Sequence, residues 1–146
     1  MKLYYPNSHY DKNYRGLVFP LLKAFIKGND FTDVQRIQLY GVTEKDFQFT
    51  DILEQADVII LTMAWNYYVQ TKQEHKAISF VQQCAAEHKK VIAFNAGDFG
   101  VKVPFMENLI ILRPSGYKSE FTKKEYALPA FIADPLIKYY HTDEIF

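Results

Sequence analysis

Residues 91–118 read VIAFNAGDFGVKVPFMENLIILRPSGYK and contain two short apolar runs, each followed by a polar, glycine-rich segment. The runs, 91–94 and 109–112, have the length and composition of buried strands. In an open parallel α/β sheet, ligands bind at the loops that follow the carboxyl ends of the strands. The best candidate site in the chain is therefore made of the polar and glycine residues after the two runs: Asn95, Gly97, Asp98, Gly100, Arg113, Ser115, Gly116, Tyr117 and Lys118.

Strands and helices alternate through the residues before this segment. The apolar patterns predict further strands at 2–5, 36–40 and 58–61, the last of which is continuous enough to be buried on both faces. Helical spacing and capping residues predict helices at 17–26, 52–55 and 71–89. Strands separated by helices pair in parallel through right-handed crossovers. The pattern predicts one α/β domain over residues 1–146, a three-layer Rossmann-like or flavodoxin-like fold with a mostly parallel five-stranded sheet in the order 2-1-3-4-5 or a close variant.

The composition of the chain argues against several classes of partner and site. The 17 basic and 17 acidic residues give zero formal charge, which argues against a nucleic-acid partner. The single cysteine, Cys84, rules out an internal disulfide or a cysteine zinc cluster, and its place on the apolar stripe of the predicted helix 71–89 assigns it to the core. The N-terminus has no signal-peptide pattern, and no apolar run is long enough to span a membrane, so we expect a cytoplasmic protein without a membrane span.

Common cofactor motifs are absent from the sequence. There is no Walker-type loop, and no G-x-G-x-x-G follows the first predicted strand. No two histidines stand at metal-ligand spacing, since they are scattered at His9, His75, His88 and His141. We therefore expect neither a bound cofactor nor a metal.

Asp98 and Arg113 are the charged residues with the clearest alternatives. Asp98 either closes a glycine-rich turn by bonding backbone amides, or presents a carboxylate that takes a hydroxyl proton as a general base. Arg113 either forms a salt bridge over the sheet edge, or anchors an anion or hydroxyl through its planar donors. The expected substrate contacts from the same two loops are Asn95, Gly97, Arg113, Tyr117 and Lys118.

Aromatic and polar residues also follow two other predicted strands. The predicted loop 65–68, of sequence WNYY, either caps the hydrophobic core or offers a ring for sugar stacking beside an amide group. Asn7 and His9 follow the first strand, either as ordinary loop residues or as a hydroxyl ligand and an alternative general base. These loops add His9 to the catalytic candidates and add to the substrate-binding candidates Asn7, Trp65, Asn66 and Tyr67.

Several stretches together resemble one family. They are LVFPLL at 17–22, ADVIIL at 56–61, FNAGDFG at 94–100, RPSGYKS at 113–119 and YALPAFI at 126–132. This series resembles the N-terminal half of exostosin-like glycosyltransferases of the bacterial polysaccharide-synthesis type. The resemblance implies a GT-B enzyme, in which this half holds the glycan acceptor and a C-terminal domain binds the nucleotide-sugar. It also implies catalysis without a bound metal, and no catalysis by these 146 residues alone.

Two functions follow from these patterns. The first is the acceptor-binding domain of a glycosyltransferase, in which Asp98 or His9 takes the proton of the attacking hydroxyl, Trp65 or Tyr67 stacks on a sugar ring, and Arg113 positions a polar group. The second is a non-enzymatic α/β module for ligand binding or self-association. The partner would be a C-terminal nucleotide-sugar domain or a second copy of the chain, docked on an apolar segment that includes Phe131, Ile132, Tyr139 and Tyr140.

Overall fold

The computed structural model of the chain describes residues 1–26, 32–43, 45–98, 100–117, 119 and 121–128. Its centre is a six-stranded sheet with the strand order β2-β1-β3-β4-β5-β6, in which every pair of neighbours is parallel. The α/β prediction is confirmed, with six strands in place of five, because a sixth strand extends the predicted order beyond β5. The strands are β1 (Lys2–Tyr4), β2 (Gln48–Phe49), β3 (Val58–Ile60), β4 (Val91–Phe94), β5 (Leu109–Arg113) and β6 (Glu125–Ala127).

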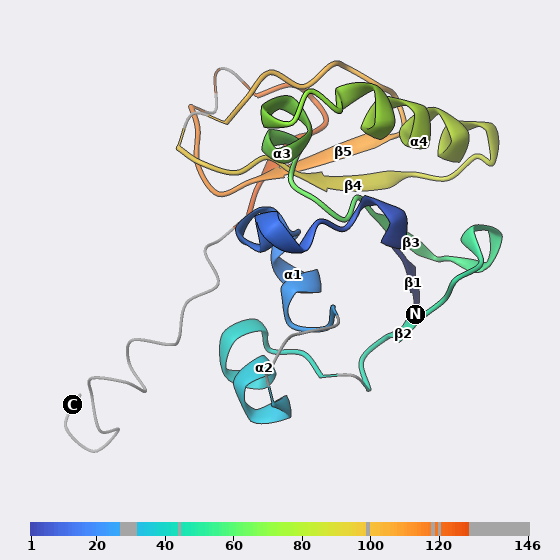
Figure 1. The fold of residues 1–146 in the computed structure, drawn as a ribbon, viewed down its shortest axis with the longest axis vertical. Coiled ribbons are helices and arrows are strands. Elements are labelled where there is room, and N and C mark those ends of the chain that lie inside the picture. The colour runs from blue at the N-terminus through green and yellow to red at the C-terminus, as the bar shows by residue number, and fades with distance from the viewer. Residues whose placement is uncertain (27–31, 44, 99, 118, 120, 129–146) are drawn as a thin grey trace.

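Helices lie on both sides of this sheet. In Figure 1, α3 and α4 lie on one side of β4, and α1 lies on the other. Short 3-10 turns connect strands and helices, among them η1 (Asn7–His9), η2 (Lys12–Leu17) and η3 (Leu53–Gln55). The α-helices are α1 (Pro20–Lys23), α2 (Asp33–Tyr40), α3 (Trp65–Gln70) and α4 (Glu74–Ala86).

The segment 36–40 belongs to helix α2, so the prediction of a strand there is wrong. Thr32 forms a capping box, in which its hydroxyl accepts from the Gln35 amide at 3.3 Å and its own amide donates to Gln35 Oε1 at 2.8 Å. Gly41 ends the helix in the left-handed conformation, at φ 67°. These end signals outweigh the short alternation of apolar and polar residues at 36–40, and the second strand of the sheet is Gln48–Phe49.

The core lies between the sheet and the helices. Along α4, the side chains of Ala77, Val81 and Cys84 have no exposed surface, which confirms the core position of the cysteine, whereas Ala85, also expected on the apolar stripe, is exposed. Burial raises the pKa of the Cys84 thiol to about 11, so this group is not a nucleophile near neutral pH. None of the helices in the described ranges has the length and apolar character needed to cross a bilayer.

Candidate functional site

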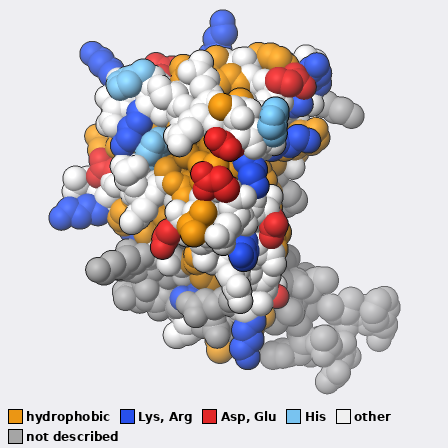
Figure 2. All heavy atoms as spheres, turned by 90° about the vertical axis from the view of Figure 1, so that its right-hand side faces the viewer, with side chains coloured by type: hydrophobic (Ala, Val, Ile, Leu, Met, Phe, Trp, Pro, Cys, Tyr) orange, Lys and Arg blue, Asp and Glu red, His pale blue; other side chains and the backbone are white. Residues whose placement is uncertain are grey.

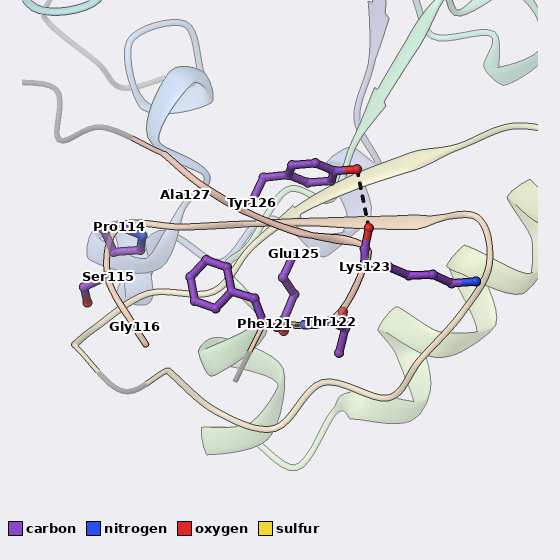
Figure 3. A pocket seen from close by; sticks show the side chains of 9 residues that line it. All are labelled: Pro114, Ser115, Gly116, Phe121, Thr122, Lys123, Glu125, Tyr126 and Ala127. Atoms are coloured by element: carbon purple, nitrogen blue, oxygen red, sulfur yellow. Dashed lines mark hydrogen bonds between the residues drawn. The ribbon is translucent and has the colours of Figure 1, made fainter. Parts of the chain in front are cut away.

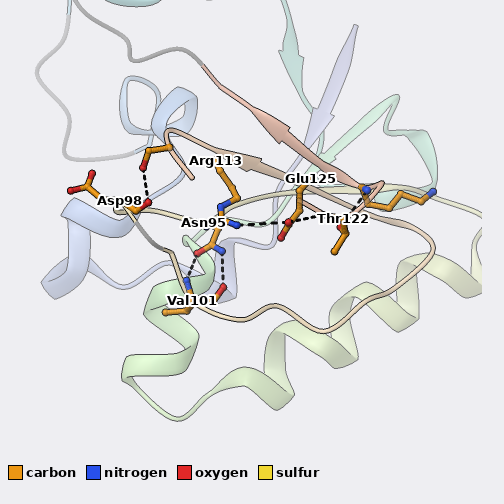
Figure 4. A network of polar contacts seen from close by, with 8 residues as sticks. Asn95, Asp98, Val101, Arg113, Thr122 and Glu125 are labelled. Atoms are coloured by element: carbon orange, nitrogen blue, oxygen red, sulfur yellow. Dashed lines mark hydrogen bonds and ion pairs between the residues drawn. The ribbon is translucent and has the colours of Figure 1, made fainter. Parts of the chain in front are cut away.

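Polar side chains gather on one face of the sheet, at the carboxyl ends of β4 and β5 and at Glu125, the first residue of β6. The register pairs Ala93 with Ile111 and Ile111 with Glu125, and paired residues of a sheet share a face. One step further along β4, the Asn95 amide donates to Leu112 O at 2.9 Å, so Asn95 lies beside Arg113. The apolar rows of this face therefore end in a cluster that contains Asn95, Arg113 and Glu125 (Figure 4).

The loops that follow β4 and β5 are tied together. The Ser115 hydroxyl lies 3.2 Å from Gly97 O and 2.9 Å from Asp98 O, which makes it a donor to both carbonyls. The loops after the two apolar runs therefore lie side by side, as expected, for the described residues of both loops; Lys118 lies outside them. The segment 65–68, which we expected on the same rim, is buried. Asp98 is exposed, and in Figure 4 its carboxylate points away from Arg113 and Glu125. Tyr117 is also exposed, at 67%.

Asn66 and Asn95 hold the β4 loop instead of facing a ligand. Asn95 is fully buried; its Nδ2 donates to Val101 O at 2.8 Å, and its Oδ1 accepts from the Val101 amide at 3.0 Å. Asn66 does the same to Ala96, with its Nδ2 donating to Ala96 O at 3.0 Å and its Oδ1 accepting from the Ala96 amide at 2.6 Å. Both amides are consumed by backbone groups, so the prediction that they contact substrate is corrected: they position the loop between Ala96 and Val101.

Arg113 forms an ion pair within the wall of the site, which is the first of its two predicted alternatives. Its Nη1 lies 3.7 Å from Glu125 Oε2, and the two side chains are 9% and 8% exposed. Glu125 Oε2 also accepts from the Thr122 amide at 3.0 Å, and the guanidinium lies over the Phe121 ring, 5.1 Å from its centroid. Because Arg113 is held in this way, it supports Glu125 in the wall of the site, in place of the direct ligand contact that we predicted.

A pocket of about 610 Å³ opens along β6, the outer described strand of the sheet. We call it the edge pocket. Figure 3 shows that it takes side chains from both faces of the strand, with the Tyr126 ring on one side and Phe121 and Glu125 on the other. Its lining residues are Pro114, Ser115, Gly116, Phe121, Thr122, Lys123, Glu125, Tyr126 and Ala127. The sequence interpretation missed Glu125 and Phe121, although an acidic residue at the start of a short apolar strand is a usable signal.

Gly100 allows the loop to close tightly over Asn95 and Arg113. It has φ +62°, and a Cβ added there would lie 2.8 Å from Asn95 Nδ2 and 3.0 Å from Arg113 Nη2. We expect Gly100→Ala to lower the free energy of unfolding by about 2–3 kcal/mol, because backbone strain and overlap add. Urea denaturation measures this loss. The matched control is Gly97→Ala, at φ +82° with open space around it, for which we expect about 1 kcal/mol. Equal losses for both variants would contradict close packing at Gly100.

The predicted aromatic loop 65–68 is the buried helix α3. Trp65 is 0% exposed and Tyr67 is 4% exposed, so neither ring offers a face on which a sugar could stack. The Tyr67 hydroxyl donates to Asp11 Oδ2 at 3.2 Å and accepts from Gln73 Nε2 at 3.3 Å. The second of the two original interpretations, a stacking platform, is therefore corrected to the first, a cap on the core.

The crevice between β1 and β3, where the strand order reverses and ligands of such sheets commonly bind, is closed by the chain itself. The loop after β1 pairs with the loop after β3 through Phe19 N to Thr62 O at 2.9 Å and Ala64 N to Leu17 O at 2.6 Å. The Thr62 hydroxyl adds a bond to Pro6 O at 2.7 Å. The open part of the carboxyl edge thus lies at β4, β5 and β6.

His9 lies in the closed part of the edge, two strands away from β4. It is 6% exposed, and its Nδ1 lies 2.8 Å from the Tyr68 hydroxyl. Burial, with a contribution from Lys76, lowers the pKa of His9 to about 4, and burial raises the pKa of Tyr68. His9 is therefore a neutral core residue, which corrects its prediction as a general base. Asn7 is exposed in η1, the turn that follows β1, whereas Asp98 follows β4.

The buried His9 makes stability depend on pH. The unfolded chain binds a proton at the ordinary histidine pKa near 6.5, whereas the folded chain does so only near 4. We expect this contribution, about 3 kcal/mol, to be complete above pH 6.5 and to be lost as pH falls from 6.5 toward 4. Urea denaturation at a series of pH values checks this, with His9→Gln flattening the dependence and the exposed His75→Gln leaving it unchanged. A wild-type curve that is flat over this range would contradict a neutral, buried His9.

A second concave region, of about 560 Å³, lies at the opposite end of the sheet, where α4 ends. It includes the cations Lys89 and Lys124, but these serve the fold. Lys89 Nζ donates to Glu54 O and Ala56 O, each at 2.9 Å, and Lys124 pairs with Glu107 at 2.9 Å. Figure 2 shows the face at this end, where acidic and basic side chains are interspersed. Within the described parts of the chain, no three His, Cys, Asp or Glu side chains gather as a metal site would require.

Comparison of the chain with protein-family models, with curated proteins and with solved structures finds no match. The functional interpretation therefore depends on the geometry of the carboxyl edge and on the sequence motifs that form it.

Proposed function

We propose that this chain is the acceptor-binding domain of a glycosyltransferase and that it holds the glycan in the edge pocket. One observation carries the proposal: a pocket of about 610 Å³ along β6 combines two aromatic rings, Phe121 and Tyr126, with a carboxylate, Glu125. Sugar rings present C–H faces that pack on aromatic rings, and hydroxyl groups that need directional hydrogen-bond partners. The pocket offers both.

The sequence motifs of the proposed family support the same location. FNAGDFG and RPSGYKS form the loops after β4 and β5, which Ser115 ties together beside the pocket. In the proposed reaction the acceptor hydroxyl attacks the anomeric carbon of a nucleotide-sugar held by a C-terminal domain. Asp98 is the candidate base on this rim, since its carboxylate is exposed and makes no hydrogen bond with a described residue. Of the two predicted bases it is the one that remains accessible.

The proposal is tested by titrating the chain with a panel of oligosaccharides and nucleotide-sugars, followed by calorimetry and by NMR shifts. We expect binding of at least one glycan, and no binding of nucleotide-sugars. The shifts should centre on Ser115, Phe121 and Tyr126. Tyr126, which is 52% exposed, should contribute through its ring, so Tyr126→Ala should weaken binding about 10-fold.

The matched control is Tyr14→Ala, at another partly exposed tyrosine, 41% accessible, in η2. It should leave the affinity unchanged. A chain that binds no glycan, or whose glycan binding is unaffected by Tyr126→Ala, contradicts the proposed site. Concentration-dependent self-association without glycan binding would favour the second function, a self-association module.

A further inference from the structure

Glu125 lines the edge pocket with a carboxylate of which one oxygen accepts no hydrogen bond from a described residue. Its side chain is 8% exposed, and its Oε2 is occupied by the Thr122 amide at 3.0 Å and by Arg113 Nη1 at 3.7 Å. Its other oxygen, Oε1, makes no hydrogen bond with a described residue. Figure 3 shows the Glu125 side chain among the lining residues, below the strand that carries it. A nearly buried carboxylate with one oxygen fixed presents the other oxygen to a ligand in a defined direction.

The charges around Glu125 determine what that ligand is. The positive charge of Arg113 is paired with Oε2, at 3.7 Å from its Nη1. The other charged lining residue, Lys123, extends away from Glu125 in Figure 3, and its Nζ lies over the Phe105 ring, 5.5 Å from the centroid. Among the described lining residues, the ligand therefore meets an anionic acceptor and no cation aimed at it.

Such a wall favours hydroxyl donors and opposes anions. A hydrogen bond from a hydroxyl to a carboxylate is stronger than one between neutral groups, whereas a second carboxylate brought against Glu125 would be repelled. Ser115 adds no free donor to change this balance, because its hydroxyl is used by Gly97 O and Asp98 O.

We propose that Glu125 determines the ligand class of the edge pocket: it accepts hydroxyl hydrogen bonds from a neutral glycan and excludes uronic-acid glycans, while Arg113 is the positioning residue that holds it. This inference rests on the proposed function, because it assigns the acceptor class of the same site.

The test compares pairs of oligosaccharides of equal length that differ only at C6, as hexose or as the corresponding uronic acid. Gluco-, galacto- and manno-configured pairs are titrated into the whole chain by calorimetry. We expect the neutral member of the pair that binds to bind at least about 10-fold more tightly. Because this comparison needs no variant, it stands even where a substitution impairs folding.

Variants then assign the selectivity to the residue. Glu125→Gln should weaken binding of the neutral glycan about 10-fold or more and remove the preference between the two members. Glu107→Gln, at a carboxylate whose side chain is 73% exposed in the other concave region, is the matched control and should change neither. Circular dichroism verifies that each variant is folded.

The outcomes separate this inference from the proposed function. Tighter binding of uronic-acid glycans, equal binding of both members, or a preference that Glu125→Gln leaves intact would overturn the assignment of Glu125 while glycan binding itself stands. Absence of binding by every neutral and acidic glycan would overturn the proposed function, and this inference with it.

Discussion

Replacement of Trp65 by alanine is expected to lower the free energy of unfolding by about 3–5 kcal/mol. The Trp65 side chain is 0% exposed and packs near Tyr68, with ring centroids 6.2 Å apart, so the truncation leaves a large cavity in the core. Urea denaturation followed by circular dichroism measures the loss. A small loss of stability, below about 1 kcal/mol, would contradict burial of Trp65 in the core and indicate that its ring is exposed.

Two companion variants show whether the loss comes from packing. Trp65→Phe keeps an aromatic ring and removes an indole Nε1 that is buried without a hydrogen-bond partner, so its cost should be clearly smaller. Tyr126→Ala removes an aromatic ring that is 52% exposed, and it should change stability by no more than about 0.5 kcal/mol. We therefore expect the two aromatic positions to differ, with a loss of stability at Trp65 and a loss of the proposed glycan binding at Tyr126.

Replacement of Arg113 by methionine is expected to cost about 3 kcal/mol or more. The substitution leaves the Glu125 carboxylate, in a side chain only 8% exposed, with the Thr122 amide but without its cation. An uncompensated buried charge is more costly than the loss of a surface pair. Thermal and urea unfolding of the variant at pH 7 measure the cost.

A double replacement tests the cause of that cost. Arg113→Met together with Glu125→Leu removes both charges and leaves apolar side chains, so we expect it to recover most of the lost stability. If the double variant is as unstable as the sum of the two single variants, the ion pair is not what makes Arg113 necessary. Packing against Phe121 and Gly116 would then be the main contribution.

Most of the fold could be predicted from the sequence because buried strands and helices require runs or periodic patterns of apolar residues. The runs at 91–94 and 109–112 became β4 and the first four residues of β5, since continuous apolar runs of that length are stable only inside a sheet. The prediction of a strand at 36–40 was wrong because the alternation of apolar and polar residues there is short. The signal that marks a helix, the capping box at Thr32, lies four residues before this segment. β6 was missed because a strand of only three residues, Glu125–Ala127, leaves almost no periodic signal.

The sequence predicts which loops form the candidate site, but it does not predict which way their side chains point. Glycine-rich segments after two neighbouring strands placed the Asp98 loop beside the Arg113 loop, which the bonds from Ser115 confirm. Which way each side chain points depends on tertiary contacts that leave no local pattern. Asn66 and Asn95 turn inward to backbone partners, and Trp65 turns into the core, although all three follow strands as ligand-binding residues do. The apolar segment with Phe131, Ile132, Tyr139 and Tyr140 lies outside the described residues.

The position of the edge pocket along the last described strand has a consequence for polymer recognition. A closed cavity admits only the end of a chain, whereas the edge pocket is lined from both faces of β6, with Tyr126 on one face and Glu125 on the other. If the proposed glycan binding is correct, we expect internal units of a polysaccharide to bind here as well as its terminus. Affinity that rises with oligomer length and then levels off is the behaviour that this shape produces.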